Sequence, residues 1–171
     1  KELLRLFLEF SPDICFHLEI HPALLSEELK KELRQLPAGL LHLEAGIQSL
    51  REPVLEKSRR IGKLSDALEG LKFLCSLSNM ETHADLIAGL PLYRLDEIFE
   101  DIYTLAGYRA GEIQLESLKL LPGTEMRHRA DELGIRYSPL PPYEVLQTGE
   151  ISVGELQTAR RLSRLLDAFY N

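Results

Sequence analysis

Polar residues that could bind a ligand stand at the ends of short apolar stretches of this chain. Glu19 and His21 come just before Pro22, which cannot donate a hydrogen bond to a strand ladder and so ends the strand. Alternation along a strand places Glu19 and His21 on one face. Gln48 follows a second stretch and offers donors and an acceptor, which suits a ribose or an amino-acid head group. On their own, these residues also fit an ordinary hydrogen-bonded acid and amide at strand ends.

Two further features carry charge of opposite sign. Asp85 lies within an apolar stretch, and each buried polar group without a partner costs about 1–3 kcal/mol. We therefore expect Asp85 to have a partner, either a ligand or a structural hydrogen bond. Arg59, Arg60 and Lys63 form a basic patch on an otherwise acidic chain. This patch is either a solvated loop or the source of one arginine whose planar fork binds a carboxylate.

The hydrophobic pattern predicts a scaffold that brings these residues together. Strands are expected at 14–20, 40–46, 81–88 and 112–120, and helices at 1–10, 26–36, 51–58, 66–77, 94–106, 125–133 and 153–170. Parallel strands need such helical crossovers. In parallel α/β folds, ligands collect at the carboxyl ends of the strands. We therefore predict an α/β fold, a partial (βα) barrel of about four parallel strands plus a C-terminal helix.

The chain is expected to divide into two parts. Residues 1–134 are predicted to form the partial barrel, and residues 135–171 a C-terminal extension. The extension begins with a proline-rich segment around Pro139, Pro141 and Pro142, which should run extended over the surface. Ser152 and Glu155 have the spacing of a capping box and predict the start of the last helix.

Composition excludes several classes of partner. The 171 residues carry a net charge of -7, whereas a duplex-binding surface needs an excess of lysine and arginine. No apolar run approaches the roughly 18–20 residues of a membrane span. The expected partner is a small-molecule substrate, with neither nucleic acid nor membrane. Two cysteines far apart in the sequence favour a reducing compartment, so a cytoplasmic location is predicted.

No metal site is predicted within this chain. Cys15 and Cys75 are its only cysteines, too few for a cysteine-ligated centre. Four histidines are interpreted as core-edge or surface residues because they lack a spacing such as His-x-x-x-His. They are His17, His42, His83 and His128.

Four segments, in order, resemble the second half of the radical S-adenosylmethionine (radical SAM) core. Glu19-Ile20-His21-Pro22 resembles the family's E-x-[NHD]-P. Gly46-Ile47-Gln48-Ser49, followed by Val54-Leu55 and Arg59-Arg60, resembles the GIQS…VL…R run of the oxygen-independent coproporphyrinogen oxidase branch. Asp85 to Pro91 resembles D-[LI]-I-x-G-[LF]-P, and Leu121 to Thr124 contains the PGT of the family. The match covers about residues 14 to 130, and the tail is similar to that of the cobalamin-binding-domain branch.

The resemblance implies a role for each matching residue. Glu19 would hydrogen-bond the amino-acid end of S-adenosylmethionine, and Arg60 would pair with its carboxylate. Gln48 and Asp85 would face the ribose and methionine portions, and the backbone around Lys119 would pass near the adenine. The family cleaves S-adenosylmethionine reductively with a [4Fe–4S] cluster, which yields a 5′-deoxyadenosyl radical; cobalamin is a further possible cofactor.

The chain departs from the family pattern in one respect. The C-x-x-x-C-x-x-C motif that holds the cluster is missing, so the resemblance implies a fragment of an iron–sulfur oxidoreductase that is inactive by itself. No catalytic residue is assigned within it, and no cofactor is expected to stay bound to it. The exposed edge of the first strand is expected to favour self-association. The alternatives are a barrel-like module that binds a small ligand or a protein, and an unrelated metal-free barrel enzyme.

Overall fold

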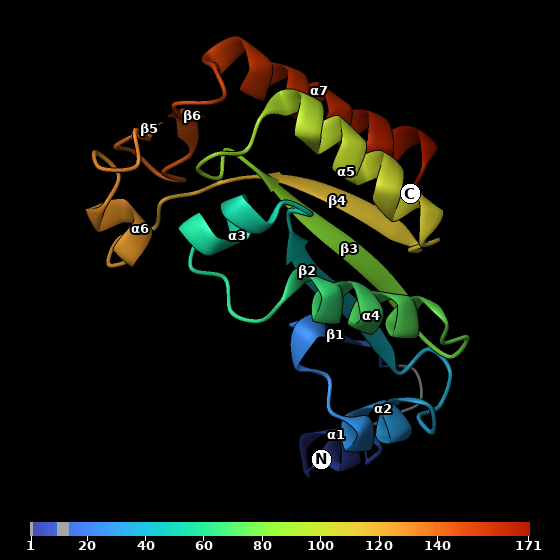
Figure 1. Cartoon of the computed structure of the whole chain (residues 1–171). Helices are drawn as coiled ribbons and strands as arrows, with labels where there is room; N and C mark the ends of the chain where they lie inside the picture. Colours follow the sequence, from blue (N-terminus) through green and yellow to red (C-terminus); the bar gives the residue numbers. More distant parts are fainter. Residues whose placement is uncertain (1, 10–13) are drawn as a thin grey trace.

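A parallel sheet of four strands forms the centre of the molecule (Figure 1). The structure is a computed structural model, and it describes residues 2–9 and 14–171. The strands are β1 (Phe16–Ile20), β2 (Leu41–Gln48), β3 (Glu81–Ala88) and β4 (Glu112–Ser117). They lie in sequence order, and each pairs in parallel with the next. The predicted partial (βα) barrel is confirmed.

Helices connect the strands and cover one face of the sheet. The connections contain η1 (Pro22–Leu24) with α2 (Glu27–Leu33), then α3 (Glu52–Lys57) with α4 (Leu64–Cys75), then α5 (Leu95–Gly107). The C-terminal helix α7 (Val153–Phe169) contacts α5 and β4. Figure 1 shows α4 and α5 on the same side of the sheet, with α7 beside α5. The crossovers through α4 and α5 thus return the chain over the same face of the sheet.

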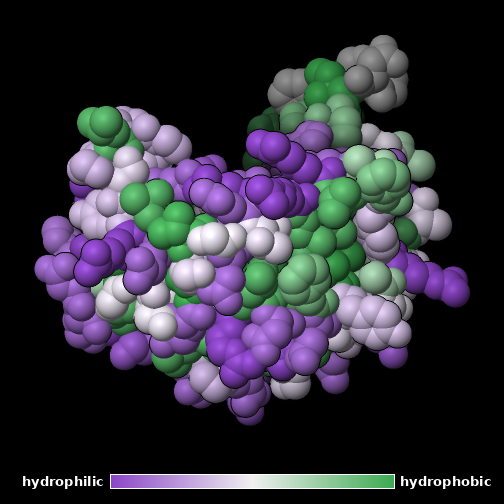
Figure 2. Space-filling view, turned by 90° about the horizontal axis from the view of Figure 1, so that it is seen from above, coloured by the Kyte–Doolittle hydropathy of each residue, from purple (hydrophilic) through white to green (hydrophobic). Residues whose placement is uncertain are grey.

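The two faces of the sheet differ in chemistry. On β2, Leu43, Ala45 and Ile47 are buried towards the helices, whereas Glu44 and Gln48 alternate with them and lie on the open face. The strands of a parallel sheet covered on both faces usually have continuous hydrophobic sequences. The alternation in β2 therefore indicates that one face of this sheet is not covered by helices. Figure 2, viewed from above, shows the surface hollowed on one side between two raised parts. The open face is therefore where a ligand can lie.

The segment after β4 differs from the sequence prediction. The expected helix 125–133 is only one turn long, α6 (Glu125–His128), although Thr124 caps it as expected. The expected extended segment contains a small antiparallel pair, β5 (Arg136–Tyr137) and β6 (Val145–Gln147), that the sequence analysis missed. Two- and three-residue strands are too short to show an alternating pattern. The capping box of Ser152 and Glu155 is present at the start of α7.

The N-terminal helix α1 (Glu2–Phe7) lies where a helix over 1–10 was predicted, and residues 1 and 10 fall outside the described part. Leu4 and Phe7 of α1 are buried, which explains the apolar spacing in this stretch. Within residues 2–9 and 14–171, no helix combines the length and the apolar character that a membrane crossing requires.

A buried aspartate holds the loop after β2 in place. Asp101 of α5 is 1% exposed and accepts hydrogen bonds from Leu50 N at 2.7 Å, Ser49 Oγ at 3.3 Å and Tyr93 Oη at 2.6 Å. Arg51 Nε donates to its other oxygen at 2.9 Å. Because all of these donors follow β2 or β3, the network fixes the chain next to the carboxyl ends of both strands.

Candidate functional site

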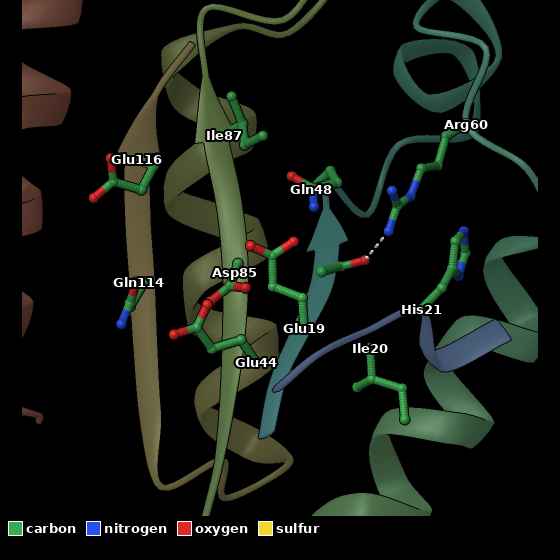
Figure 3. A pocket seen from close by; sticks show the side chains of 11 residues that line it. Glu19, Ile20, His21, Glu44, Gln48, Arg60, Asp85, Ile87, Gln114 and Glu116 are labelled. Carbon is green, nitrogen blue, oxygen red and sulfur yellow. Dashed lines mark hydrogen bonds between the residues drawn. The ribbon is translucent and has the colours of Figure 1, made fainter. Parts of the chain in front are cut away.

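A pocket of about 390 Å³ lies on the open face of the sheet. Residues from all four strands line it, together with the loop that carries Arg60. Figure 3 shows Glu19, Glu44 and Asp85 in the centre of the view, Arg60 and His21 on one side, and β4 on the other. The pocket thus collects side chains from the carboxyl halves of parallel strands, where α/β proteins bind ligands.

Four of the five residues predicted from the sequence line this pocket. They are Glu19, Gln48, Arg60 and Asp85. Lys119 is not part of the lining: it is exposed just beyond β4, with its Nζ 3.4 Å from Glu116 Oε2. The structure therefore brings together residues from β1, β2, β3 and the loop after α3, while the contact at Lys119 stays a prediction.

Asp85 is held in an unfavourable setting for a charged carboxylate. Burial has the largest effect on its pKa, followed by the nearby carboxylates of Glu44, Glu19 and Glu116, and together they raise it from 3.8 to about 7. Its Oδ1 atom is buried and has no hydrogen-bond partner among the described residues. A carboxyl group kept in this state is expected to have a partner from outside the chain.

Arg60 supplies the positive charge of the pocket. Its Nη2 donates to the Gly46 carbonyl oxygen at 2.7 Å, the bond drawn in Figure 3. Its Nε is buried without a partner, and no carboxylate pairs with it within the described part of the chain. The neighbouring Arg59, in contrast, pairs with Glu125. A half-buried guanidinium with one free edge is suited to bind a ligand carboxylate.

The end of β2 is shaped to place Gln48 in the pocket. The ladder with β3 is irregular between Gly46 and Gln48, and Gln48 has a positive φ of 73°. A side chain at Gly46 would place its Cβ 2.6 Å from Gln48 Nε2 and 3.0 Å from Arg60 Nη2. The left-handed backbone of Gln48, a residue other than glycine, costs about 1–3 kcal/mol, and strain of this kind concentrates at binding sites. The glycine therefore lets both side chains meet above the strand.

His21 also faces the pocket without a hydrogen-bond partner. Both of its ring nitrogens are buried and unpaired among the described residues. Burial lowers its pKa and the positive charge of Arg60 lowers it further, against a smaller raising effect of nearby backbone groups, so the neutral ring is favoured. A neutral imidazole offers one donor and one acceptor to a ligand.

The sequence analysis missed three polar residues of the pocket, namely Glu44, Gln114 and Glu116. Each sits at an inward position of its strand, two residues from another polar residue. Glu44 lies two positions after His42, and Gln114 and Glu116 alternate with Ile113 and Leu115. The alternation of polar and apolar residues within predicted strands could have identified them.

Comparison with known proteins gives one sequence relative and several similar structures. The heme chaperone HemW of Haemophilus influenzae is 26% identical over 127 residues, which cover 74% of this chain and 32% of that protein. The radical S-adenosylmethionine methyltransferase TsrM of Kitasatospora setae, solved with cobalamin and a [4Fe–4S] cluster, matches with a TM-score of 0.62. That match has 16% identity and covers 82% of this chain and 30% of TsrM.

A third match extends the same pattern. Coproporphyrinogen III oxidase (HemN) of Escherichia coli, described as a radical SAM enzyme, has a TM-score of 0.58 and 16% identity, with 79% of this chain and 37% of HemN covered. The predicted resemblance to the radical SAM superfamily is confirmed. The fold corresponds to one part of the barrel of these enzymes. The similar structures include a coproporphyrinogen oxidase and a methyltransferase that was solved with cobalamin. This chain spans about a third of the length of each of these proteins.

The C-terminal segment matches a separate family model. Residues 131–171 match a model described as a protein of unknown function (DUF4080). The match includes β5, β6 and α7 and leaves the four-stranded sheet outside.

Proposed function

We propose that this chain is the C-terminal part of the core of a radical SAM enzyme and that its pocket binds S-adenosylmethionine. The observation that carries the proposal is the convergence of unpaired polar groups in one pocket. Gln48 Oε1, Arg60 Nε, Asp85 Oδ1 and both ring nitrogens of His21 are buried there without partners among the described residues. Such groups are costly unless a ligand satisfies them.

The charge of the pocket suits this ligand. S-adenosylmethionine carries a sulfonium, an ammonium and a carboxylate group. Glu19, Glu44 and Glu116 give the pocket a negative character that favours the two cationic groups, and Arg60 provides a separate site for the carboxylate. Gln48 and Asp85 are assigned to the ribose and methionine portions, Glu19 to the amino-acid end, and the backbone around Lys119 to the adenine.

The cluster would have to be held by a longer protein that contains this chain. The chain has two cysteines, Cys15 and Cys75, and neither lines the pocket. When bound, the [4Fe–4S] cluster supplies the electron for reductive cleavage of S-adenosylmethionine. The 171-residue chain alone is accordingly proposed to be inactive, and the longer protein to be an Fe–S oxidoreductase of the cytoplasm. Cobalamin as a further cofactor, a small-molecule substrate and self-association through the edge of β1 are part of the same proposal.

The chain's own residues would orient and shield the bound molecule. Arg60, already fixed by its bond to the Gly46 carbonyl, would hold the carboxylate in one place. Asp85, whose pKa lies near neutrality, would donate or accept a hydrogen bond according to its protonation state. Ile87, also in the lining, would exclude water from one side of the pocket.

Binding can be tested with a ligand that lacks one group. We would titrate the anaerobically reconstituted longer protein with S-adenosylmethionine and with its decarboxylated analogue, for the wild type and Arg60→Gln. Loss of a charge-assisted pair is expected to weaken S-adenosylmethionine binding by about 10-fold or more. The analogue should bind both proteins equally. An equal loss for both ligands would refute the assigned role of Arg60, and no saturable binding of either ligand would refute the proposed function.

A further inference from the structure

A second cluster of ligand-type side chains lies on the open face, at the opposite end of the strands from Gln48. His42 is near the start of β2, His83 near the start of β3, and Glu112 is the first residue of β4. In the strand register His83 stands beside Glu112, and His42 lies two positions before Glu44, the β2 partner of His83. Parallel pairing therefore brings residues 41 and 29 positions apart in the chain into one group.

The ligand atoms of this group converge. His42 Nε2 and His83 Nε2 are 2.5 Å apart, and His83 Nε2 is 2.8 Å from Glu112 Oε2. All three ligand atoms lie within 4.8 Å of one another. Both histidines are buried, at 9% and 5% exposure, whereas the Glu112 side chain is 36% exposed. Two ring nitrogens this close need a cation or a shared proton between them, because two lone pairs would repel.

The other nitrogen of each imidazole already has a partner. Gln114 lies with its amide 2.8 Å from His83 Nδ1, and Glu81 Oε2 is 3.5 Å from His42 Nδ1. Metal-binding histidines almost always use the second nitrogen in this way, which fixes the ring and directs the free lone pair towards the ion. The amide of Gln114 can present its oxygen to His83 as readily as its nitrogen.

We propose that His42, His83 and Glu112 bind a divalent transition-metal ion of the zinc type. Two imidazoles and one carboxylate form a three-ligand set that leaves a fourth position open. In a tetrahedral zinc site with metal–ligand bonds of about 2.0–2.1 Å, two ligand atoms lie about 3.3 Å apart. The two pairs of atoms at 2.5 Å and 2.8 Å must therefore each move apart by less than about 1 Å. A pocket of about 350 Å³ is lined by His42 and Glu81, so it reaches one of the three ligands.

Gln114 contacts His83 and also lines the first pocket, so the ion would stabilise the strand next to that pocket. This proposal does not depend on the proposed function.

The test uses the 171-residue chain, freed of metal with a chelator and titrated with zinc chloride by calorimetry. One equivalent should bind to the wild type and raise its thermal midpoint. His42→Gln and Glu112→Gln should each weaken binding by at least about 100-fold, because even the loss of an outer hydrogen-bond partner costs about 10–100-fold. His128→Gln, at an exposed histidine of α6, is the matched control and should bind zinc like the wild type.

Cobalt(II) provides a second readout. The cobalt-loaded wild type should show the visible absorption of four-coordinate cobalt, and Glu112→Gln should alter it. Glu112 is only partly buried, so this variant is expected to fold even if the histidine variants do not, with circular dichroism as the check. Zinc binding that survives both His42→Gln and Glu112→Gln, or no saturable binding to the folded wild type, would overturn the proposal.

Discussion

The most revealing single change in the pocket is Asp85→Asn. This carboxyl group has a pKa of about 7 in the folded chain, compared with 3.8 as its usual value. The folded state therefore binds a proton that the unfolded state has already released, and stability falls as the pH rises through this window. The loss is complete above the folded-state pKa. Replacement by asparagine removes the titration and keeps the size of the side chain.

The magnitude follows from the size of the pKa shift. A shift of about three units corresponds to about 4 kcal/mol of destabilisation at full ionisation. The side chain is only partly buried and the pocket is open to water, which reduces the expected effect to about 1–2 kcal/mol. Asp85→Asn should therefore be more stable than the wild type by about 1–2 kcal/mol at about pH 8.5, and by clearly less at about pH 5.

The assay is urea unfolding of the 171-residue chain at both pH values, followed by circular dichroism. Asp131→Asn, at an exposed aspartate, serves as the matched control and should change stability equally at both pH values. Other carboxyl groups titrate in wild type and variant alike, so the difference between the two proteins isolates Asp85. A difference that is independent of pH would refute the reasoning that this group is held protonated by the pocket.

Three further substitutions test the scaffold and the pocket. Asp101→Ala leaves its buried donors without an acceptor and should lower the free energy of unfolding by about 3–5 kcal/mol, as read from urea midpoints. Gly70→Ala would place a Cβ 2.1 Å from the Pro22 carbonyl oxygen and should lower the free energy of unfolding by more than about 2 kcal/mol. Its control is Gly107→Ala in α5, where the new Cβ meets nothing within 4 Å and should stabilise the chain by up to about 1 kcal/mol. Equal thermal midpoints for the two variants would contradict the close packing of α4 on η1. Gly46→Ala should weaken S-adenosylmethionine binding to the longer protein about 10-fold in calorimetry with little loss of stability, because it displaces only the flexible ends of side chains; unchanged affinity would count against the assigned pocket.

Much of the fold follows from local patterns in the sequence. The predicted strand at 81–88 matches β3, and the other three strands differ only at their ends. Strands that are apolar on one face, separated by amphipathic helices, leave few alternatives to a parallel sheet. The start of α6 was predicted, but its shortness and the β5–β6 pair were not. Their positions depend on contacts such as that between Leu120 N and the Tyr143 carbonyl oxygen, which no local pattern encodes.

The candidate site was predictable only in part. Glu19, Gln48, Arg60 and Asp85 were singled out from their types and positions, the family resemblance implied their roles, and the structure places all four in one pocket. The cluster at the other end of the strands was missed because its members are distant in sequence. His42 and His83 meet only through strand register, so a search for short histidine spacings could not detect them.

The central claim is that this pocket belongs to an enzyme that cleaves S-adenosylmethionine. The direct measurement is 5′-deoxyadenosine formation by the longer protein, reconstituted anaerobically with iron and sulfide and then reduced. We expect product from the wild type and from Glu56→Gln, an exposed glutamate of α3. Glu19→Gln and Asp85→Asn should lower the rate by at least about 10-fold, since each alters a group assigned to the bound molecule. Cluster formation with a rate that neither substitution changes would contradict the assigned site, and the absence of both cluster and product would contradict the proposed function itself.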